Sequence, residues 1–143
     1  MQSLKNLEGA DLKNIDLSGA DMRSANLMSA NLVAANLSCT DFSGANLFSS
    51  KVMRADLCNA NLSGTNFQKS NLTKANLKGT NLNSADLMGA NLSQAVLTGS
   101  DLIRASLVEA NLLEVDLSGA DLTEAKLSGR YQREGYYSRG ANL

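Results

Sequence analysis

Large apolar residues recur at every fifth position of this chain, from residue 7 to residue 127. The residue two places before each of them is usually small, the residue one place before is usually Asn or Asp, and the two that follow vary. With the apolar residue as position i, the chain contains 25 such units, of which 21 have Leu at i and the others have Met22, Phe42, Val52 or Phe67. A period of five fits neither an α-helix nor a simple β-strand, so the pattern indicates an internal repeat.

Positions i−2 and i are predicted to point inward together. Successive side chains of an extended segment alternate between two faces, which puts i−2 and i on one face and the Asn or Asp at i−1 on the other. Position i−2 is Ala in sixteen units and Ser or Thr in six. We therefore expect an interior column of Leu and small residues and an exterior column of Asn and Asp.

The two variable positions, i+1 and i+2, are expected to turn the chain. All nine Gly residues within the array occupy i+2, as in a recurring tight corner. Asn and Asp at i−1 are suited to hydrogen bonding with nearby backbone at such corners. Four units have another residue at i−1, where an outward side chain should be tolerated: Lys51, Val96, Ser106 and Lys126.

With the motif A-(D/N)-L-x-x repeated in frame over residues 5–129, the chain resembles the pentapeptide repeat proteins. The resemblance implies an all-β fold, a right-handed quadrilateral parallel β-helix (a solenoid) with four repeats per coil and about six coils. Residues 1–129 are expected to form this helix and residues 130–143 a tail that contains three Tyr residues and ends in Ala-Asn-Leu. The alternatives for the tail are a cap over the last coil, a dimerisation segment, or the start of a longer array.

Composition and charge exclude several classes of function. Thirteen basic and 14 acidic residues give a net charge of −1, so nucleic acid is not an expected partner. No apolar stretch approaches the roughly 20 residues of a membrane span and no signal-peptide core is visible, so we expect a cytoplasmic protein with no membrane partner. His is absent, which removes the commonest general base and metal ligand. Together with the family resemblance, this favours a noncatalytic protein with no cofactor, metal or small-molecule substrate.

The candidate partner-binding face consists of outward apolar residues at i+1. If one coil contains 20 residues, as the resemblance implies, these residues stack on two neighbouring sides of the helix. Stacked apolar side chains that face outward favour a contact surface, and Met adapts well to such surfaces. The alternatives are scattered surface hydrophobes and a self-association face. The six candidates are Met28, Val33, Phe48, Met53, Met88 and Val108.

A candidate basic patch lies beside these apolar residues and contains Lys51, Arg54, Lys69, Lys74 and Lys78. Only Asp56 opposes them between residues 51 and 78, so this segment carries +4 (five basic residues minus one acidic). A solvated face that keeps the rod soluble is the simpler interpretation.

Two further groups are weaker candidates. An acidic column at i−1 on one side contains Asp21, Asp41, Asp101 and Asp121, but Asp is one of the two standard residues at i−1, so no metal site is expected. Cys39 and Cys58 are nineteen residues apart on one side, where a disulfide is within geometric reach. Two free thiols are expected in a cytosolic chain.

We expect a protein-binding or scaffold module whose partner is an unidentified protein or a second copy of the chain. The resemblance also offers a DNA mimic that modulates DNA gyrase, as some pentapeptide repeat proteins do. Duplex DNA carries about one charge per 1.7 Å, so a mimic about 30 Å long needs on the order of 18 negative charges. The near balance of acidic and basic residues and the short length disfavour this reading. A third possibility is that the rod is one segment of a larger modular protein.

Overall fold

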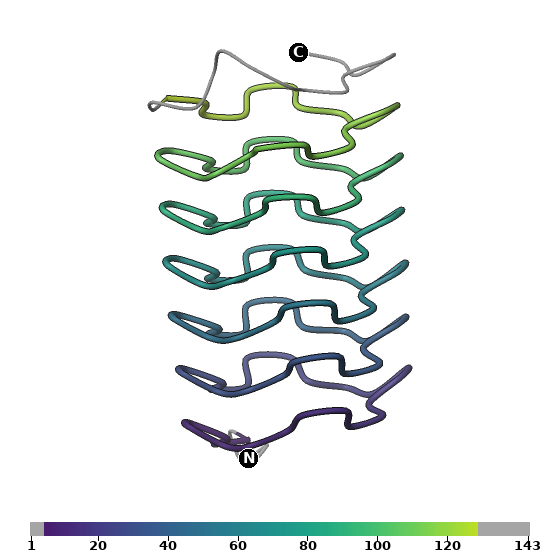
Figure 1. Ribbon diagram of the computed structural model, residues 1–143, viewed down its shortest axis with the longest axis vertical. Coiled ribbons are helices and arrows are strands. Elements are labelled where there is room, and N and C mark those ends of the chain that lie inside the picture. The colour runs from purple at the N-terminus through teal and green to yellow at the C-terminus, as the bar shows by residue number, and fades with distance from the viewer. Residues whose placement is uncertain (1–4, 129–143) are drawn as a thin grey trace.

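The chain folds into a rod of stacked coils in the computed structural model, which describes residues 5–128 (Figure 1). Each β-bridge is parallel and joins position i−1 of one unit to the equivalent position twenty residues later, from Asn6↔Asn26 to Ser106↔Lys126. Four units therefore make one coil, as predicted. Over residues 5–128 every strand is a single bridged residue between two turns, and no helix that could span a membrane is present there.

The coils and sides are numbered here for reference. Coils 1 to 6 comprise residues 5–24, 25–44, 45–64, 65–84, 85–104 and 105–124, respectively. Sides 1 to 4 follow one another around each coil and contain, in coil 1, Leu7, Leu12, Leu17 and Met22 at position i. The same side of the next coil begins twenty residues later.

The core is the stack of side chains at i and i−2, as the alternation predicted. From Met22 to Leu122 every residue at position i is at most 5% exposed, and position i−2 is buried from Ala25 to Ala120. Coil 1 is more open, because Leu7, Leu12 and Leu17 are only partly buried. Most inward hydroxyls donate to backbone carbonyls, as Thr65 Oγ1 does to the carbonyl of Phe42 at 2.9 Å.

The corners from Gly9 to Glu124 share a hydrogen-bonded turn with a positive φ at position i+2. Position i+2 has a φ between +53° and +67° in all units from Gly9 to Glu124, although only eight of these residues are Gly and sixteen are not. The next residue donates its N–H to the carbonyl of position i, as Ala10 does to Leu7 at 3.0 Å. A hydrogen-bonded turn with a positive φ at its third residue has the signature of a type II turn. Non-Gly residues are thus held in a left-handed conformation that costs roughly 1–2 kcal/mol each.

The backbone N–H groups explain why Asn and Asp are repeated. In the unit of Leu27, the N–H groups of Asn26, Leu27 and Ser29 donate to neighbouring coils, and the N–H of Ala30 closes the turn. The remaining N–H, of Met28, donates to the side-chain Oδ1 of Asn26 at 3.2 Å. The same bond from i+1 to the side chain at i−1 occurs in all 21 units that have Asn or Asp there. An Asn or Asp side chain at i−1 therefore completes the hydrogen bonding of these 21 units.

Val96 offers a direct test of this role, because it occupies i−1 without a side-chain acceptor and is 37% exposed. The substitution Val96→Asn is expected to raise the free energy of unfolding by about 0.5–1.5 kcal/mol, the typical gain from one hydrogen bond. Chemical unfolding followed by circular dichroism measures the change. The reverse substitution at an intact unit, Asn81→Val, serves as control and should lower stability. If both changes have the same sign, the acceptor role is wrong.

Candidate protein-binding face

The predicted apolar residues form two stacked columns at i+1. On side 1, backbone hydrogen bonds connect coils 2 and 3 (Ser29 N–H to the carbonyl of Phe48, 2.9 Å) and coils 5 and 6 (Gly89 N–H to the carbonyl of Val108, 2.9 Å). On side 2, the N–H of Ala34 donates to the carbonyl of Met53 at 2.9 Å. Met53 therefore follows Val33 in the i+1 column, one coil later. Gln68 lies between Phe48 and Met88 in the side 1 column, so that column has two apolar stretches.

The apolar columns flank the centre of side 2 in coils 2 and 3. Positions i+1 of sides 1 and 2 lie in the turns on either edge of side 2, so Met28 and Phe48 border one edge and Val33 and Met53 the other. These four side chains are half-buried. The outward residue between them in coil 3 is Lys51, which is exposed. The arrangement is a shallow apolar surface with a cation at its centre.

Three large apolar residues at outward positions of residues 5–128 are exposed, and only Met88 was among the six candidates. Met88 is the most exposed of the six candidates, at 40%, whereas Leu113, which was not a candidate, reaches 48%. Leu113 continues the side 2 column of Val33 and Met53, but Thr73 and Ser93 separate it from them. Its position at i+1 was sufficient to predict an outward side chain. Val96 on side 3 was also not a candidate, although its place at i−1 predicted an outward side chain. The inward prediction is wrong for Leu127, which occupies position i but is 38% exposed.

Lys69 connects the basic patch to the apolar surface. Its Nζ lies 5.8 Å from the centroid of the Phe48 ring, within the range of a cation–π contact. Arg54 and Lys74 stack at i+2 of side 2, and Lys51 lies at the middle of that side. Lys78 is on side 3, so it does not lie with the apolar columns. Within residues 5–128 the only ion pairs are Arg23–Asp21 and Arg104–Glu124, so the five basic residues have no carboxylate partner there.

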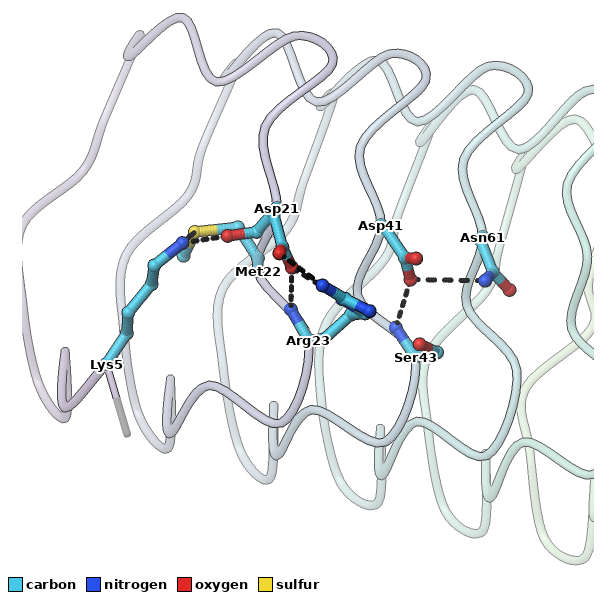
Figure 2. Close-up of polar contacts among 7 residues, drawn as sticks. All are labelled: Lys5, Asp21, Met22, Arg23, Asp41, Ser43 and Asn61. Atoms are coloured by element: carbon cyan, nitrogen blue, oxygen red, sulfur yellow. Dashed lines mark hydrogen bonds and ion pairs between the residues drawn. The ribbon is translucent and has the colours of Figure 1, made fainter. Parts of the chain in front are cut away.

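The acidic column on side 4 is interrupted and partly compensated. Figure 2 shows Asp21, Asp41 and Asn61 in line on successive coils. Arg23 forms a bidentate pair with Asp21, with Nε–Oδ1 and Nη2–Oδ2 distances of 2.9 and 2.7 Å. This side-chain hydrogen bond, followed by the backbone N–H of Arg23, holds the pKa of the Asp21 carboxyl well below its ordinary value.

The neighbouring positions weaken the column further as a negatively charged stripe. Asp41 accepts hydrogen bonds from the N–H of Ser43 at 2.9 Å and from Nδ2 of Asn61 at 3.1 Å (Figure 2). Asn81 follows Asn61, so two neutral amides separate Asp41 from Asp101. The Lys5 ammonium group donates to the backbone carbonyl of Asp21 at the first coil. The stripe is therefore not a continuous line of negative charge.

The remaining candidates give no chemical site in the described part of the chain. Over residues 5–128 no group of three Cys, Asp or Glu side chains is placed to hold a metal ion. Cys39 and Cys58 are free thiols, and the N–H of Cys39 donates to the carbonyl of Cys58 at 2.9 Å, so they lie in adjacent coils as expected. The predictions for the tail, residues 130–143, lie outside the described residues.

The geometry defines a β-solenoid protein built from five-residue units. A sequence profile of pentapeptide repeats matches eight copies, over residues 6–34, 25–52, 53–89 and 90–129. The chain belongs to the pentapeptide repeat family, and its fold is the right-handed quadrilateral β-helix of that family.

Solved structures of pentapeptide repeat proteins resemble the chain along most of its length. HetL of Nostoc sp. strain PCC 7120, involved in heterocyst differentiation regulation, is 27% identical over 96% of this chain and 74% of its own, with a TM-score of 0.48. Rfr23 of Cyanothece 51142 is 24% identical over 94% of this chain and 88% of its own, with a TM-score of 0.50. QnrB1, a plasmid-mediated fluoroquinolone resistance protein, is 20% identical over 96% and 77%, with a TM-score of 0.46. A comparison with curated protein sequences finds no match.

Proposed function

We propose that the protein is a noncatalytic binding module whose contact surface is centred on Phe48. The observation that carries the proposal is the placement of this ring. Phe48 is an aromatic side chain directed outward on a hydrogen-bonded column, with Met28 beside it and Met53 across side 2. Aromatic anchors surrounded by adaptable apolar residues are typical of the residues that contribute most to binding.

The rigidity of the coil supports this assignment. The backbone of Phe48 is bonded on both sides, because its carbonyl accepts from Ser29 and its N–H donates to Asn46 Oδ1 at 3.1 Å. A surface that is already ordered loses little conformational entropy when it binds. The apolar surface is therefore prepared for a partner without rearrangement of the backbone.

The charges around Phe48 indicate the chemistry of the partner. Lys51 at the centre of the apolar surface is exposed, as are Arg54 and Lys69 at its edges. Carboxylates on a partner would pair with these three cations while an apolar group displaces Lys69 from the ring, an arrangement that increases association rate and specificity. We infer a protein partner whose contact surface combines apolar groups with acidic residues.

Mimicry of DNA on gyrase is less well supported. Two Asn residues interrupt the acidic column on side 4, and Arg23 compensates the charge of Asp21. Side 2 presents three of the five basic candidates. A duplex-like surface requires negative charge at regular short intervals, and this distribution does not supply it.

The substitution Phe48→Asp tests the proposal. We expect it to weaken partner binding at least about tenfold, because it removes an anchor of the kind that dominates interfaces. The unfolding temperature should not change, since Phe48 lies outside the core. Proteins retained from a native lysate by wild type are identified first, and the purified partner is then titrated against both chains.

Ser38→Asp is the matched control, because Ser38 also occupies i+1 but lies on side 3. It introduces the same charge away from the apolar surface. Retention of the same proteins by Phe48→Asp and by wild type would contradict the proposal, as would loss of binding in both variants. Loss in Phe48→Asp alone supports it.

A further inference from the structure

The two edges of side 2 change from positive to negative between coils 4 and 6. The i+2 column on one edge contains Lys69, Gly89 and Glu109, and the i+2 column on the other contains Lys74, Gln94 and Glu114. Backbone hydrogen bonds hold these columns in register: Lys69 donates to Met88 and Gly89 to Val108, while Lys74 donates to Ser93 and Gln94 to Leu113, all at 2.8 to 3.0 Å. Both edges therefore carry Lys in coil 4, a neutral residue in coil 5 and Glu in coil 6.

These four charged side chains are not neutralised within the described chain. Lys69, Lys74, Glu109 and Glu114 are all exposed, and neither of the two ion pairs found over residues 5–128 includes any of them. Glu114 accepts one hydrogen bond, from Gln94 Nε2 at 2.6 Å, which leaves its charge in place. The separation of charge along side 2 is thus available to a second molecule.

We propose that side 2 of coils 4 to 6 is a self-complementary docking surface for a second copy of this chain in antiparallel orientation. A two-fold axis that lies across side 2 at coil 5 places coil 4 of one protomer opposite coil 6 of its partner. Lys69 then faces Glu109 of the partner subunit, and Lys74 faces Glu114 of the partner subunit. Because the contact is isologous, each pair occurs twice, and four ion pairs form from four charged positions.

The orientation follows from the charges. A parallel dimer through the same side would place equal coils opposite each other, which brings Lys69 against Lys74 and Glu109 against Glu114. Like charges in opposition disfavour that arrangement. Among the four sides, side 2 alone has this change on both edges within the described residues, because the remaining i+2 columns read Gly79, Gly99, Gly119 and Ser84, Arg104, Glu124.

The uncharged residues of the same surface suit a close contact. The middle of side 2 in coils 4 to 6 contains Asn71, Asn91 and Asn111, so no charge is buried there. Met88, 40% exposed, lies in coil 5 at the proposed axis and would meet Met88 of the partner subunit. Leu113, 48% exposed, lies opposite Thr73 of the partner subunit. Two of the most exposed apolar side chains of residues 5–128 are thereby covered.

The dimer should be weak and sensitive to salt, because exposed ion pairs contribute little individually and are screened. Sedimentation velocity of the full chain at roughly 100 µM, a concentration that populates a micromolar complex, is the measurement. We expect a dimer at roughly 0.05 M salt and a monomer at roughly 0.5 M salt. A chain that is monomeric at both salt concentrations overturns the proposal.

Two charge-reversed chains give the sharper test. One carries Lys69→Glu with Lys74→Glu, and the other Glu109→Lys with Glu114→Lys. Each alone presents only like charges across the axis and should be monomeric, whereas an equimolar mixture pairs every position and should form a one-to-one dimer. Circular dichroism establishes that both chains remain folded, as expected for exposed positions.

The control is the pair Lys13→Glu with Lys78→Glu, in coil 1 and on side 3, which changes the net charge as Lys69→Glu with Lys74→Glu does. This chain should dimerise like wild type. A dimer in either charge-reversed chain alone, a mixture that stays monomeric, or loss of the dimer in the control would each overturn the antiparallel contact.

Discussion

The substitution Phe67→Ala is expected to lower the free energy of unfolding by about 3–5 kcal/mol, the usual cost of removing a buried aromatic side chain. Phe67 lies in coil 4 on side 1 and has no solvent exposure. It replaces the Leu that most units have, between Leu47 and Leu87 in the column. The bridges Asn46↔Asn66 and Asn66↔Asp86 fix the spacing of the coils, so the neighbours cannot close the cavity by moving together.

The comparison with Leu7→Ala separates core packing from a general loss of apolar area. Leu7 occupies the same side in coil 1 but is only partly buried. We expect a smaller loss, on the order of 1 kcal/mol, because the Leu7 side chain buries less apolar area in the folded protein than the Phe67 side chain does. Denaturant unfolding followed by circular dichroism measures both variants. Equal losses at the two positions would show that the middle coils can relax around a cavity.

The substitution Val96→Pro is expected to destabilise the protein strongly, whereas Thr98→Pro in the same unit should be nearly neutral. The N–H of Val96 donates to the carbonyl of Ala75 at 3.0 Å, which is a bond between coils. Pro removes this donor and leaves an acceptor of a buried residue unpaired, at a cost of about 1–3 kcal/mol before steric clash is added. The whole chain contains no Pro.

Thr98 differs because it is the second residue of the turn, where Pro is favoured in type II geometry. Because Val96 at i−1 has no side-chain acceptor for the N–H of Thr98, replacing Thr98 with Pro loses little hydrogen bonding. One side-chain contact is removed, from Thr98 Oγ1 to Asp116 Oδ2 at 3.3 Å. Thermal unfolding of the two variants decides the matter, and a Thr98→Pro chain less stable than Val96→Pro would refute this description of the corner.

The sequence was sufficient to predict the core. Parity alone placed i−2 and i inward, and the burial of residues such as Leu62 and Ala60 confirms it. The coil of 20 residues came from the family resemblance, because a period of five does not specify how many corners close one turn. Once that number was known, the stacking of Met28 on Phe48 and of Val33 on Met53 followed directly.

The sequence did not predict two kinds of feature: the positive φ of non-Gly residues at the corners and the contacts of long, flexible side chains. Gly at nine i+2 positions suggested special corners there, whereas residues such as Arg54 and Lys74 adopt the same positive φ. Backbone hydrogen bonds to the coils above and below fix the conformation of each corner, so the residue type at i+2 has little influence on it. The contacts of Lys69 with Phe48 and of Arg23 with Asp21 depend on rotamers of long side chains, which no repeat pattern records.

The coil length of twenty residues has a consequence for insertions and deletions. Removal of one residue would shift every later Leu out of the interior, so the array beyond that point could not form. Removal of one whole unit keeps all Leu inward but moves every later outward residue to the neighbouring side, because one unit is a quarter of a coil. Only gains or losses of twenty residues keep an outward column straight. Length changes within this rod therefore come in three kinds: those that destroy the fold, those that move later outward residues to a neighbouring side, and those that lengthen or shorten the rod by whole coils.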